Sequence, residues 1–499
     1  VTYLIKEGNR FLLEAVTWNT EFRRDIKKLI IMVQGHIGKP LRASLPETIA
    51  SSVRTFYKNR GRPAVQAQAS LHLDRKKHTG SITLNLKPGP RIIVENVKIN
   101  GNKKVRTRFI EKIFDIDQGS PMKSGRIRNA ERRLADTGLF SKVWTVPLDI
   151  DRFLADKHAD FSDTFRVPLL LETREVQPHE LKIRFGYSQY EKAVAGIEIG
   201  TRNAFGRGES LSLGITAGTR GYRADGDAQF YPVPGYPARA GLHCFYEDRD
   251  EISYRLRHAG ISPLLSFDIN RHEKITAGIL FEWIKTDDII LGIPQEDLAS
   301  FRIGAPFIAY TKDRRNSSLI PKRGYRLTAR VEIADSETYG DISFWRATAG
   351  YQKYFPVDRD VTFAGSVRAG VISPFGLTEE IPLALRFFAG GVSSVRGFEE
   401  RELGPQAGAE AVGGEVFGSF QAELRFRFIE DLHGSLFYDA GNVYATADTA
   451  DHKDLRSGTG IGLRYYTPAG AVRFDTAWNT APQPEEENVT YYFTIGMYF

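Results

Sequence analysis

From residue 180 to the C-terminus, the chain is a series of short segments in which apolar and polar residues alternate. In the clearest segment Phe420, Ala422, Leu424, Phe426 and Phe428 occupy every second position, with polar or charged residues between them. Because successive side chains of a strand point to opposite faces, this pattern predicts strands with one apolar and one polar face. We expect sixteen strands, at 180–188, 194–202, 210–219, 221–229, 238–248, 253–264, 273–285, 301–313, 324–334, 342–355, 361–373, 416–428, 434–444, 455–466, 471–478 and 490–499.

The lengths of the connections indicate where this series lies. Connections after even-numbered strands are mostly short, as at 203–209 and 356–360, whereas those after odd-numbered strands include 286–300 and 374–415. This asymmetry is typical of outer-membrane barrels, whose apolar strand faces meet lipid and whose polar faces line the lumen. A soluble sandwich, the alternative, would bury the apolar face instead. The pattern therefore predicts an all-β transmembrane barrel of sixteen antiparallel strands at 177–499.

The first third of the chain has another pattern, and it repeats once. Residues 8–16 align with residues 89–97 at an offset of 81, with Gly, Arg, Glu and Val recurring in register. Each copy leads into two helical segments and then two strands, and a period of about 80 residues suits a small α+β domain. We expect such domains at 9–88 and at 89–176, the second adjoining the barrel. Residues 1–8 are then the last strand of a preceding domain in a trimmed chain.

The helices of these domains are predicted by apolar residues at helical spacing. They are expected at 20–33 and 45–59 in the first domain, and at 106–114 and 125–135 in the second. A glycine follows the second helix of each domain, as is common where a helix ends.

The N-terminal third and the strand series also differ in net charge. Residues 1–178 hold 33 Lys and Arg against 19 Asp and Glu, a net charge of +14, which leaves −7 for the remainder. A basic arm is suited to anionic lipid or to an acidic partner, although solvated helix faces produce the same excess. Nothing in the sequence combines a basic patch with interleaved aromatics, so nucleic acid is not an expected partner. The lone Cys244 excludes an intrachain disulfide.

The longest connection, residues 374–415, contains a glycine-rich motif with a single arginine at its centre. Its centre, residues 390–398, reads Gly-Gly-Val-Ser-Ser-Val-Arg-Gly-Phe. An arginine in a loop that folds into a polar lumen needs carboxylate partners, because an unpaired buried charge is costly. Glu423 and Asp439 are expected on the inward faces of the twelfth and thirteenth strands. Both suit the forked guanidinium of Arg396, which lysine does not reproduce.

Several motifs together resemble the BamA/TamA outer-membrane assembly superfamily. The residues that carry the resemblance are Val395, Arg396, Gly397 and Phe398 in the loop, Phe437, Asp439 and Gly441 in an F-x-D-x-G strand motif, and the turns at 203–208, 321–324 and 467–470. The β-αα-β-β order of the N-terminal repeats is similar to that of POTRA domains, the periplasmic arms of this superfamily. Within the superfamily, the amino-acid sequence around the loop and the small number of POTRA units look closer to TamA than to BamA.

The resemblance implies a factor that inserts proteins into the bacterial outer membrane, with its POTRA domains in the periplasm. The POTRA domains would bind unfolded outer-membrane or autotransporter clients, and client strands would form at a lateral seam between the first and last barrel strands. Outer-membrane lipid and an inner-membrane-anchored subunit are further implied partners. Gly186 and Gly496 lie near this seam, and Met497 and Phe499 belong to the C-terminal signal. Thr494 departs from the pattern, since a glycine is expected there.

Other classes of protein fit less well. A two-partner secretion transporter, which exports a polypeptide through the barrel, shares the plan of arm and barrel and is the alternative function. A general porin lacks such an arm. An enzyme is not expected, because the histidines of the barrel are scattered and neither a nucleophile motif, a metal-ligand spacing nor a phosphate loop is present. No catalytic residue, metal or cofactor is therefore predicted.

Overall fold

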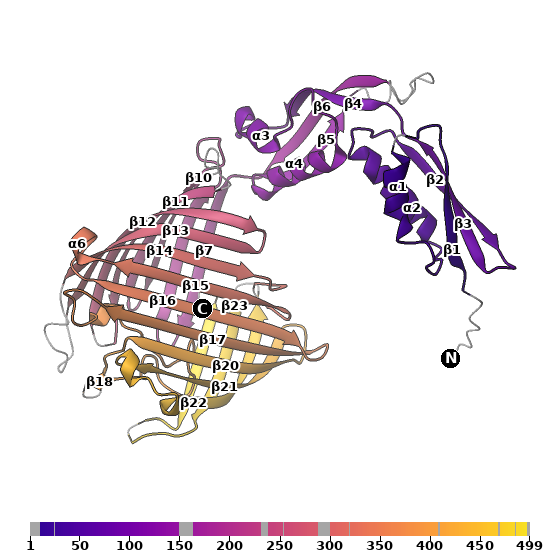
Figure 1. The fold of residues 1–499 in the computed structure, drawn as a ribbon. Coiled ribbons are helices and arrows are strands. Elements are labelled where there is room, and N and C mark those ends of the chain that lie inside the picture. Colours follow the sequence, from indigo (N-terminus) through magenta and orange to yellow (C-terminus); the bar gives the residue numbers. More distant parts are fainter. Residues whose placement is uncertain are drawn as a thin grey trace. The chain divides into compact units, whose positions relative to one another are not determined.

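The fold was obtained as a computed structural model that divides into two compact units. One unit covers residues 1–177 with 206–208, and the other covers 178–205 with 209–499. Figure 1 shows the longer helices in the first unit and a strand barrel in the second. The structure describes residues 10–23, 25–148, 163–230, 238–252, 254–287, 300–318, 320–407, 410–467, 470–484 and 486–496. Within them, no helix is both long enough and apolar enough to cross a membrane.

The described part of the first unit contains two similar α+β modules. The first consists of β1 (Leu12–Asn19), α1 (Ile26–Gln34), α2 (Leu45–Lys58), β2 (Gln66–Asp74) and β3 (Thr79–Lys87). The second consists of β4 (Arg91–Asn100), α3 (Thr107–Phe114), α4 (Ser124–Asp136), β5 (Phe140–Pro147) and β6 (Thr164–Glu175). The sheet orders are β1-β3-β2 and β4-β6-β5, with the outer strands β1 and β4 parallel to the central one. The α+β POTRA-like fold class is thereby confirmed, whereas the domain boundaries stay a prediction and residues 1–8 lie outside the described residues.

The helix predicted at 20–33 begins later than expected. The helix starts at Ile26, and the backbone N–H of Phe22 bonds the hydroxyl of Thr20 at 3.2 Å. This local side-chain bond favours a turn over a helix. The two predicted glycine stops are confirmed, because Gly61 and Gly138 have left-handed φ values of +81° and +69°.

The second unit is a closed barrel in which all neighbouring strands are antiparallel, so the predicted sixteen-stranded fold is confirmed within the described residues. Its strands are β7 (His179–Ser188), β8 (Lys192–Thr201), β9 (Ser210–Gly218), β10 (Gly221–Phe230), β11 (Ala238–Asp250), β12 (Arg255–Asn270), β13 (Glu273–Asp287), β14 (Phe301–Asp313), β15 (Gly324–Ala334), β16 (Phe344–Pro356), β17 (Val361–Pro374), β20 (Val416–Arg427), β21 (Leu432–Tyr444), β22 (Arg456–Thr467), β23 (Gly470–Asn479) and β24 (Val489–Gly496). Short elements lie in the connections: α6 (Ser336–Tyr339), η2 (Leu383–Leu385), β18 (Gln406–Ala407), β19 (Glu410–Ala411), η3 (Ala447–Thr449) and η4 (His452–Asp454).

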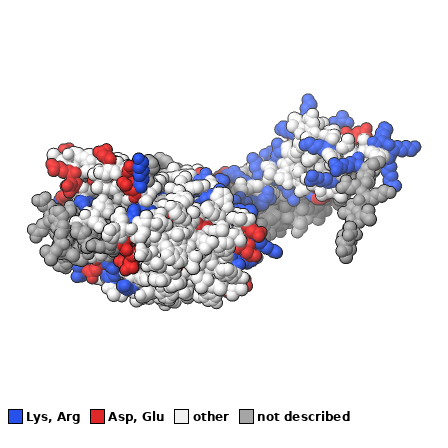
Figure 2. Space-filling model, turned by 90° about the horizontal axis from the view of Figure 1, so that it is seen from below, with Lys and Arg blue, Asp and Glu red and all other residues white. Residues whose placement is uncertain are grey.

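The outer face of the barrel is apolar and its inner face is charged. On β7, Leu181, Ile183 and Phe185 are 53–65% exposed on the outside, whereas the alternate Lys182 and Arg184 form ion pairs with Glu198. Figure 2 shows a largely uncharged barrel wall on the face in view. An apolar outer face around a charged lumen is the arrangement that lipid requires. We conclude that the barrel spans a membrane.

Candidate functional site

The candidate site is the connection between β17 and β20, residues 374–415, which we call the lumen loop. Its two arms are joined by backbone bonds between Phe387 and Gly414 at 2.8 and 3.0 Å. Leu385 packs in a cluster of buried apolar residues, and its carbonyl accepts a bond of 2.7 Å from Nη2 of Arg346 on β16. The loop is therefore held at its base before its central residues reach the inner faces of β20 to β24.

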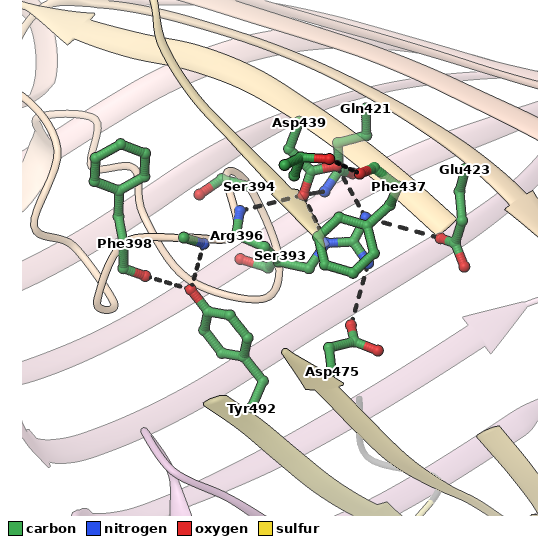
Figure 3. Close-up of polar contacts among 12 residues, drawn as sticks. Ser393, Ser394, Arg396, Phe398, Gln421, Glu423, Phe437, Asp439, Asp475 and Tyr492 are labelled. Carbon is green, nitrogen blue, oxygen red and sulfur yellow. Dashed lines mark hydrogen bonds and ion pairs between the residues drawn. The ribbon is translucent and has the colours of Figure 1, made fainter. Parts of the chain in front are cut away.

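Arg396, at the centre of the lumen loop, is buried among carboxylates of the barrel wall (Figure 3). Its Nε and Nη2 donate to the two oxygens of Asp439 on β21 at 2.6 and 2.9 Å. Its Nη1 donates to Oδ2 of Asp475 on β23 at 3.1 Å, and its guanidinium carbon lies 3.4 Å from the centre of the Phe437 ring. The side chains are 2% exposed for the arginine and 0% for both aspartates. A fork of this kind fixes both the position and the orientation of the loop.

Glu423 faces the lumen on β20, as predicted, and forms the longest of the ion pairs of Arg396. Its Oε2 is 3.9 Å from Nη2 of Arg396, within ion-pair distance but beyond hydrogen-bond distance. Its closer partners are Arg464 at 2.5 Å and Arg425 at 3.3 Å. The guanidinium group is already occupied by two aspartates, which leaves Glu423 to balance the neighbouring arginines. Asp475, which sequence reasoning missed, is the second acceptor.

The backbone that follows the arginine is fixed by the last strand. The N–H of Gly397 donates to the hydroxyl of Tyr492 at 2.9 Å, and that hydroxyl donates to the carbonyl of Phe398 at 2.6 Å (Figure 3). Gly397 has φ +106°, and a Cβ there would be 3.2 Å from the Cα of Gly458. The prediction that this glycine permits close approach to the wall is confirmed. Tyr492 was also missed, although its position on the polar face of β24 could have indicated it.

The strand motif supports the arginine from β21. Phe437 gives its ring face to the guanidinium, a cation–π contact. Gly441 leaves room for the loop, because a Cβ there would be 2.9 Å from Cγ2 of Val395. The predicted motif residues Phe437, Asp439 and Gly441 therefore meet the predicted loop residues Val395 and Arg396 in one cluster. Phe398 is buried beside Val395 in a small apolar cluster with Leu403.

The barrel closes between β24 and β7 with few register pairs. In the described residues these are Thr494 with Ser188, Ile495 with Tyr187, and Gly496 with Gly186. By comparison, β23 and β24 share eight pairs and β7 and β8 share ten. Gly496 has φ +109°, a conformation that favours glycine.

The predicted seam residues Gly186 and Gly496 are thus paired with each other. The prediction for Met497 and Phe499 falls outside the described residues.

Comparisons with known proteins agree with this geometry. A family model described as the Omp85 superfamily domain matches residues 203–499, more than half of the chain. The chain belongs to the Omp85 superfamily. A second family model, POTRA, described as a surface antigen variable number repeat, matches residues 92–162.

The Omp85 chain resembles curated relatives over most of its length. It is 24% identical to the outer membrane protein assembly factor BamA of Neisseria meningitidis, covering 84% of this chain and 58% of the relative. It is 22% identical to BamA of Nitratidesulfovibrio vulgaris, covering 100% of this chain and 63% of the relative. The chain thus spans less than two thirds of the length of these relatives. A shorter match, 35% identical over 33% of this chain and 40% of the relative, is to a sorting and assembly machinery component 50 homolog of Bos taurus.

Solved structures support the fold. BamA from Haemophilus ducreyi lacking POTRA domains 1–3 matches with a TM-score of 0.79 at 18% identity, over 98% of this chain and 99% of that chain. CdiB from Acinetobacter baumannii matches with a TM-score of 0.52 at 13% identity, over 98% and 90%. The expected superfamily is confirmed, and the nearness to TamA within it stays a prediction.

Proposed function

We propose that this Omp85 protein is an assembly factor that inserts proteins into the bacterial outer membrane. Client strands form at the seam between β7 and β24, and the POTRA modules lie in the periplasm. The observation that carries the proposal is that the described residues 489–493 of β24 have no register partner in β7, which ends at Ser188, whereas the same residues are all paired with β23. Each backbone bond contributes about 0.5–1.5 kcal/mol net, so this stretch of β24 separates from the β7 side at a lower cost than from β23.

The POTRA modules are proposed to hold clients before insertion. Their sheet orders leave β1 and β2 at the edges of the first sheet and β4 and β5 at the edges of the second. An extended client segment can add to such an edge through backbone hydrogen bonds, with little demand on its sequence. Unfolded outer-membrane or autotransporter proteins fit this mode of binding. Outer-membrane lipid and an inner-membrane-anchored subunit are the further partners that we propose.

The lumen loop is proposed to keep the wall beside the seam in its working position. Arg396 ties the loop to β21 and β23, and Tyr492 ties it to β24, the last strand. We propose a bracing part for Arg396, which its hydrogen bonds to two strands of the wall support. Bracing matters here because β24 is the strand that forms one side of the seam.

The alternative is export of a polypeptide through the barrel, as in a two-partner secretion transporter. A polypeptide that passes through the lumen has to displace the loop and leave Asp439 and Asp475 without their arginine. Breaking a buried ion pair in this way costs about 3–5 kcal/mol. Opening the seam leaves these contacts in place, which favours assembly at the seam over export.

Depletion of the protein separates the two functions. We expect the amounts of several outer-membrane barrel proteins to fall together, as measured by quantitative mass spectrometry of outer-membrane fractions. A lipoprotein of the same membrane serves as the control and should not change. If barrel proteins keep their amounts and a single secreted protein accumulates inside the cell, the transporter replaces the assembly factor.

A further inference from the structure

The lumen loop has another anchored arginine, partly buried and five residues after Arg396. Arg401 lies beyond Phe398 and has a left-handed φ of +66°, which is uncommon for a residue with a side chain. Its guanidinium forms an ion pair with Glu251 and donates to the hydroxyl of Tyr254 at 3.2 Å. The guanidinium carbon also lies 3.6 Å from the centre of the Phe388 ring. Backbone strain that persists at one residue indicates that its surroundings hold it there.

The acceptor of Arg401 is itself held by neighbouring connections. Glu251 accepts a hydrogen bond from the hydroxyl of Tyr190, and its Oε1 is 3.2 Å from Nε of Arg249. Arg249 in turn donates to Glu191 at 2.7 Å. Tyr190 and Glu191 belong to the connection between β7 and β8, whereas Glu251 and Tyr254 belong to the connection between β11 and β12. The cluster therefore connects the lumen loop to the β7–β8 and β11–β12 connections.

The two arginines bind opposite sides of the seam. Arg396 contacts β21 and β23, with Tyr492 of β24 on the adjoining backbone, and the barrel order places β24 next to β7. Arg401 contacts Glu251 and Tyr254 in the connection that follows β11, and Glu251 links it to Tyr190 in the connection that follows β7. The five residues from Arg396 to Arg401 span at most about 18 Å when fully extended. Sideways opening of the seam that carries the two anchored sides beyond this reach has to release one of the two arginines.

We infer that Arg401 and Glu251 form a second anchor, which holds the seam closed by tying the β7 side to the lumen loop. This inference rests on the proposed function, for which the seam has to open. The second anchor releases before the first, because Arg401 has one carboxylate partner with side chains 16% and 11% exposed, whereas Arg396 has two carboxylates that are fully buried. Opening thus separates the β7 side from a loop that stays on the β24 side.

The test measures seam opening directly, in the full chain purified into lipid nanodiscs. Amide hydrogen exchange of peptides that cover β24 reports how often this strand separates from β7. Arg401→Gln and Glu251→Gln should each raise that exchange rate about ten- to hundredfold. The double variant should exchange no faster than the faster single variant, because both changes remove the same contact.

A matched control is available away from the seam and from the lumen loop. Lys312 on β14 pairs with Glu273 on β13 at 2.9 Å, with side chains 24% and 16% exposed. This ion pair is partly buried, as the second anchor is, but it does not cross the seam. Lys312→Gln should therefore leave the exchange of β24 unchanged. An equal rise in this control, or no rise in Arg401→Gln, overturns the inference.

Two further variants keep the test decisive. If Arg401→Gln does not give a heat-modifiable folded barrel, Tyr254→Phe removes one acceptor of the same arginine and should raise the exchange rate by a smaller factor. Tyr187 and Ile495 are register partners across the seam, and cysteines at both positions, in a Cys244→Ser background, can lock it. Oxidation of this pair should return the exchange rate of Arg401→Gln to that of the parent. Fast exchange in the locked protein shows that the signal is not seam opening and overturns the inference.

Client assembly by the same variants distinguishes the second anchor from the proposed function. Faster exchange of β24 together with normal client assembly supports the second anchor but contradicts a function that depends on the seam. Unchanged exchange overturns the second anchor, whatever the clients do.

Discussion

Replacing Arg396 with alanine tests whether the first anchor matters to assembly. The change removes three hydrogen bonds to carboxylates, at 2.6, 2.9 and 3.1 Å, from a site where the partners are fully buried. Bonds of this kind contribute about 1.5–3 kcal/mol each, but they act on one group and do not add. Breaking a buried ion pair costs about 3–5 kcal/mol in total. Arg464 and Arg473 remain beside the carboxylates, so we expect the lower end of that range.

A loss of this size makes the loop leave its site more often, but it does not unfold the barrel. About 3–4 kcal/mol corresponds to a roughly 10²- to 10³-fold larger unseated population. Hydrogen exchange of peptides covering 390–398 measures it, because the amides of Arg396 and Gly397 bond to Asp439 and Tyr492. Arg396→Lys should fall between the parent and alanine, since lysine keeps the charge but not the fork. Client assembly should fall in the same order.

The matched control is an arginine outside this network. Arg427 at the end of β20 pairs with Asp360, and both side chains are more than a third exposed. Exposed pairs contribute at most about 1 kcal/mol, so Arg427→Ala should change neither loop exchange nor client assembly. Unchanged exchange at 390–398 in a folded Arg396→Ala barrel refutes the anchoring. Normal assembly despite fast exchange refutes its importance for function.

Three further predictions follow from the loop and from the first POTRA module. Gly458→Ala should unseat the loop as Arg396→Ala does, measured by the same exchange, because the added Cβ would collide with the carbonyl oxygen of Arg396. Burial, opposed by Arg401, raises the pKa of Glu400 from 4.5 to about 7. The seated loop then binds this proton more tightly than the unseated loop does, so seating weakens as the pH rises from 4.5 to about 7. Glu400→Gln should abolish this pH dependence, read from loop exchange corrected for intrinsic rates. Tyr57→Phe should leave exchange protection of α2 unchanged or raise its stability by about 1 kcal/mol, because the buried hydroxyl of Tyr57 has no hydrogen-bond partner in the described residues.

The strands could be predicted from the sequence because alternation is a local signal. In each barrel strand, apolar residues mark the lipid-facing positions and polar residues mark the lumen-facing ones. Most predicted strand ends therefore lie within a few residues of the strand ends in the structure. The exception is β12, which runs to Asn270, six residues past the predicted end at residue 264. Pro263 lies at that end, and proline disfavours the interior of a strand, yet Leu265 and Ile269 continue the outward alternation and are exposed on the wall. Tertiary pairing with β11 and β13 overrides the local signal of the proline.

The site was predicted in part, because its partners depend on register between distant strands. Asp439 was expected, since it lies in a recognisable strand motif with a clear inward face. Asp475 is 79 positions from Arg396 and lies two strands beyond Asp439, where its height in the wall depends on the stagger of β21, β22 and β23. No local pattern encodes that stagger. Arg401 was not singled out for the same reason, because its acceptor is 150 positions away.

The charged network around Arg396 is better suited to defining one loop position than to adding stability. Its members are Arg396, Arg425, Arg464, Arg473, Glu423, Asp439 and Asp475. Replacing such a network with apolar residues is often neutral or stabilising, whereas removing one partner is costly because charges are left buried and unpaired. A partly seated loop meets that same cost, so intermediate positions are disfavoured. The loop is thus either seated or free at Arg396, and a two-state element of this kind keeps the loop on the β24 side while the contact of Arg401 with the β7 side is released.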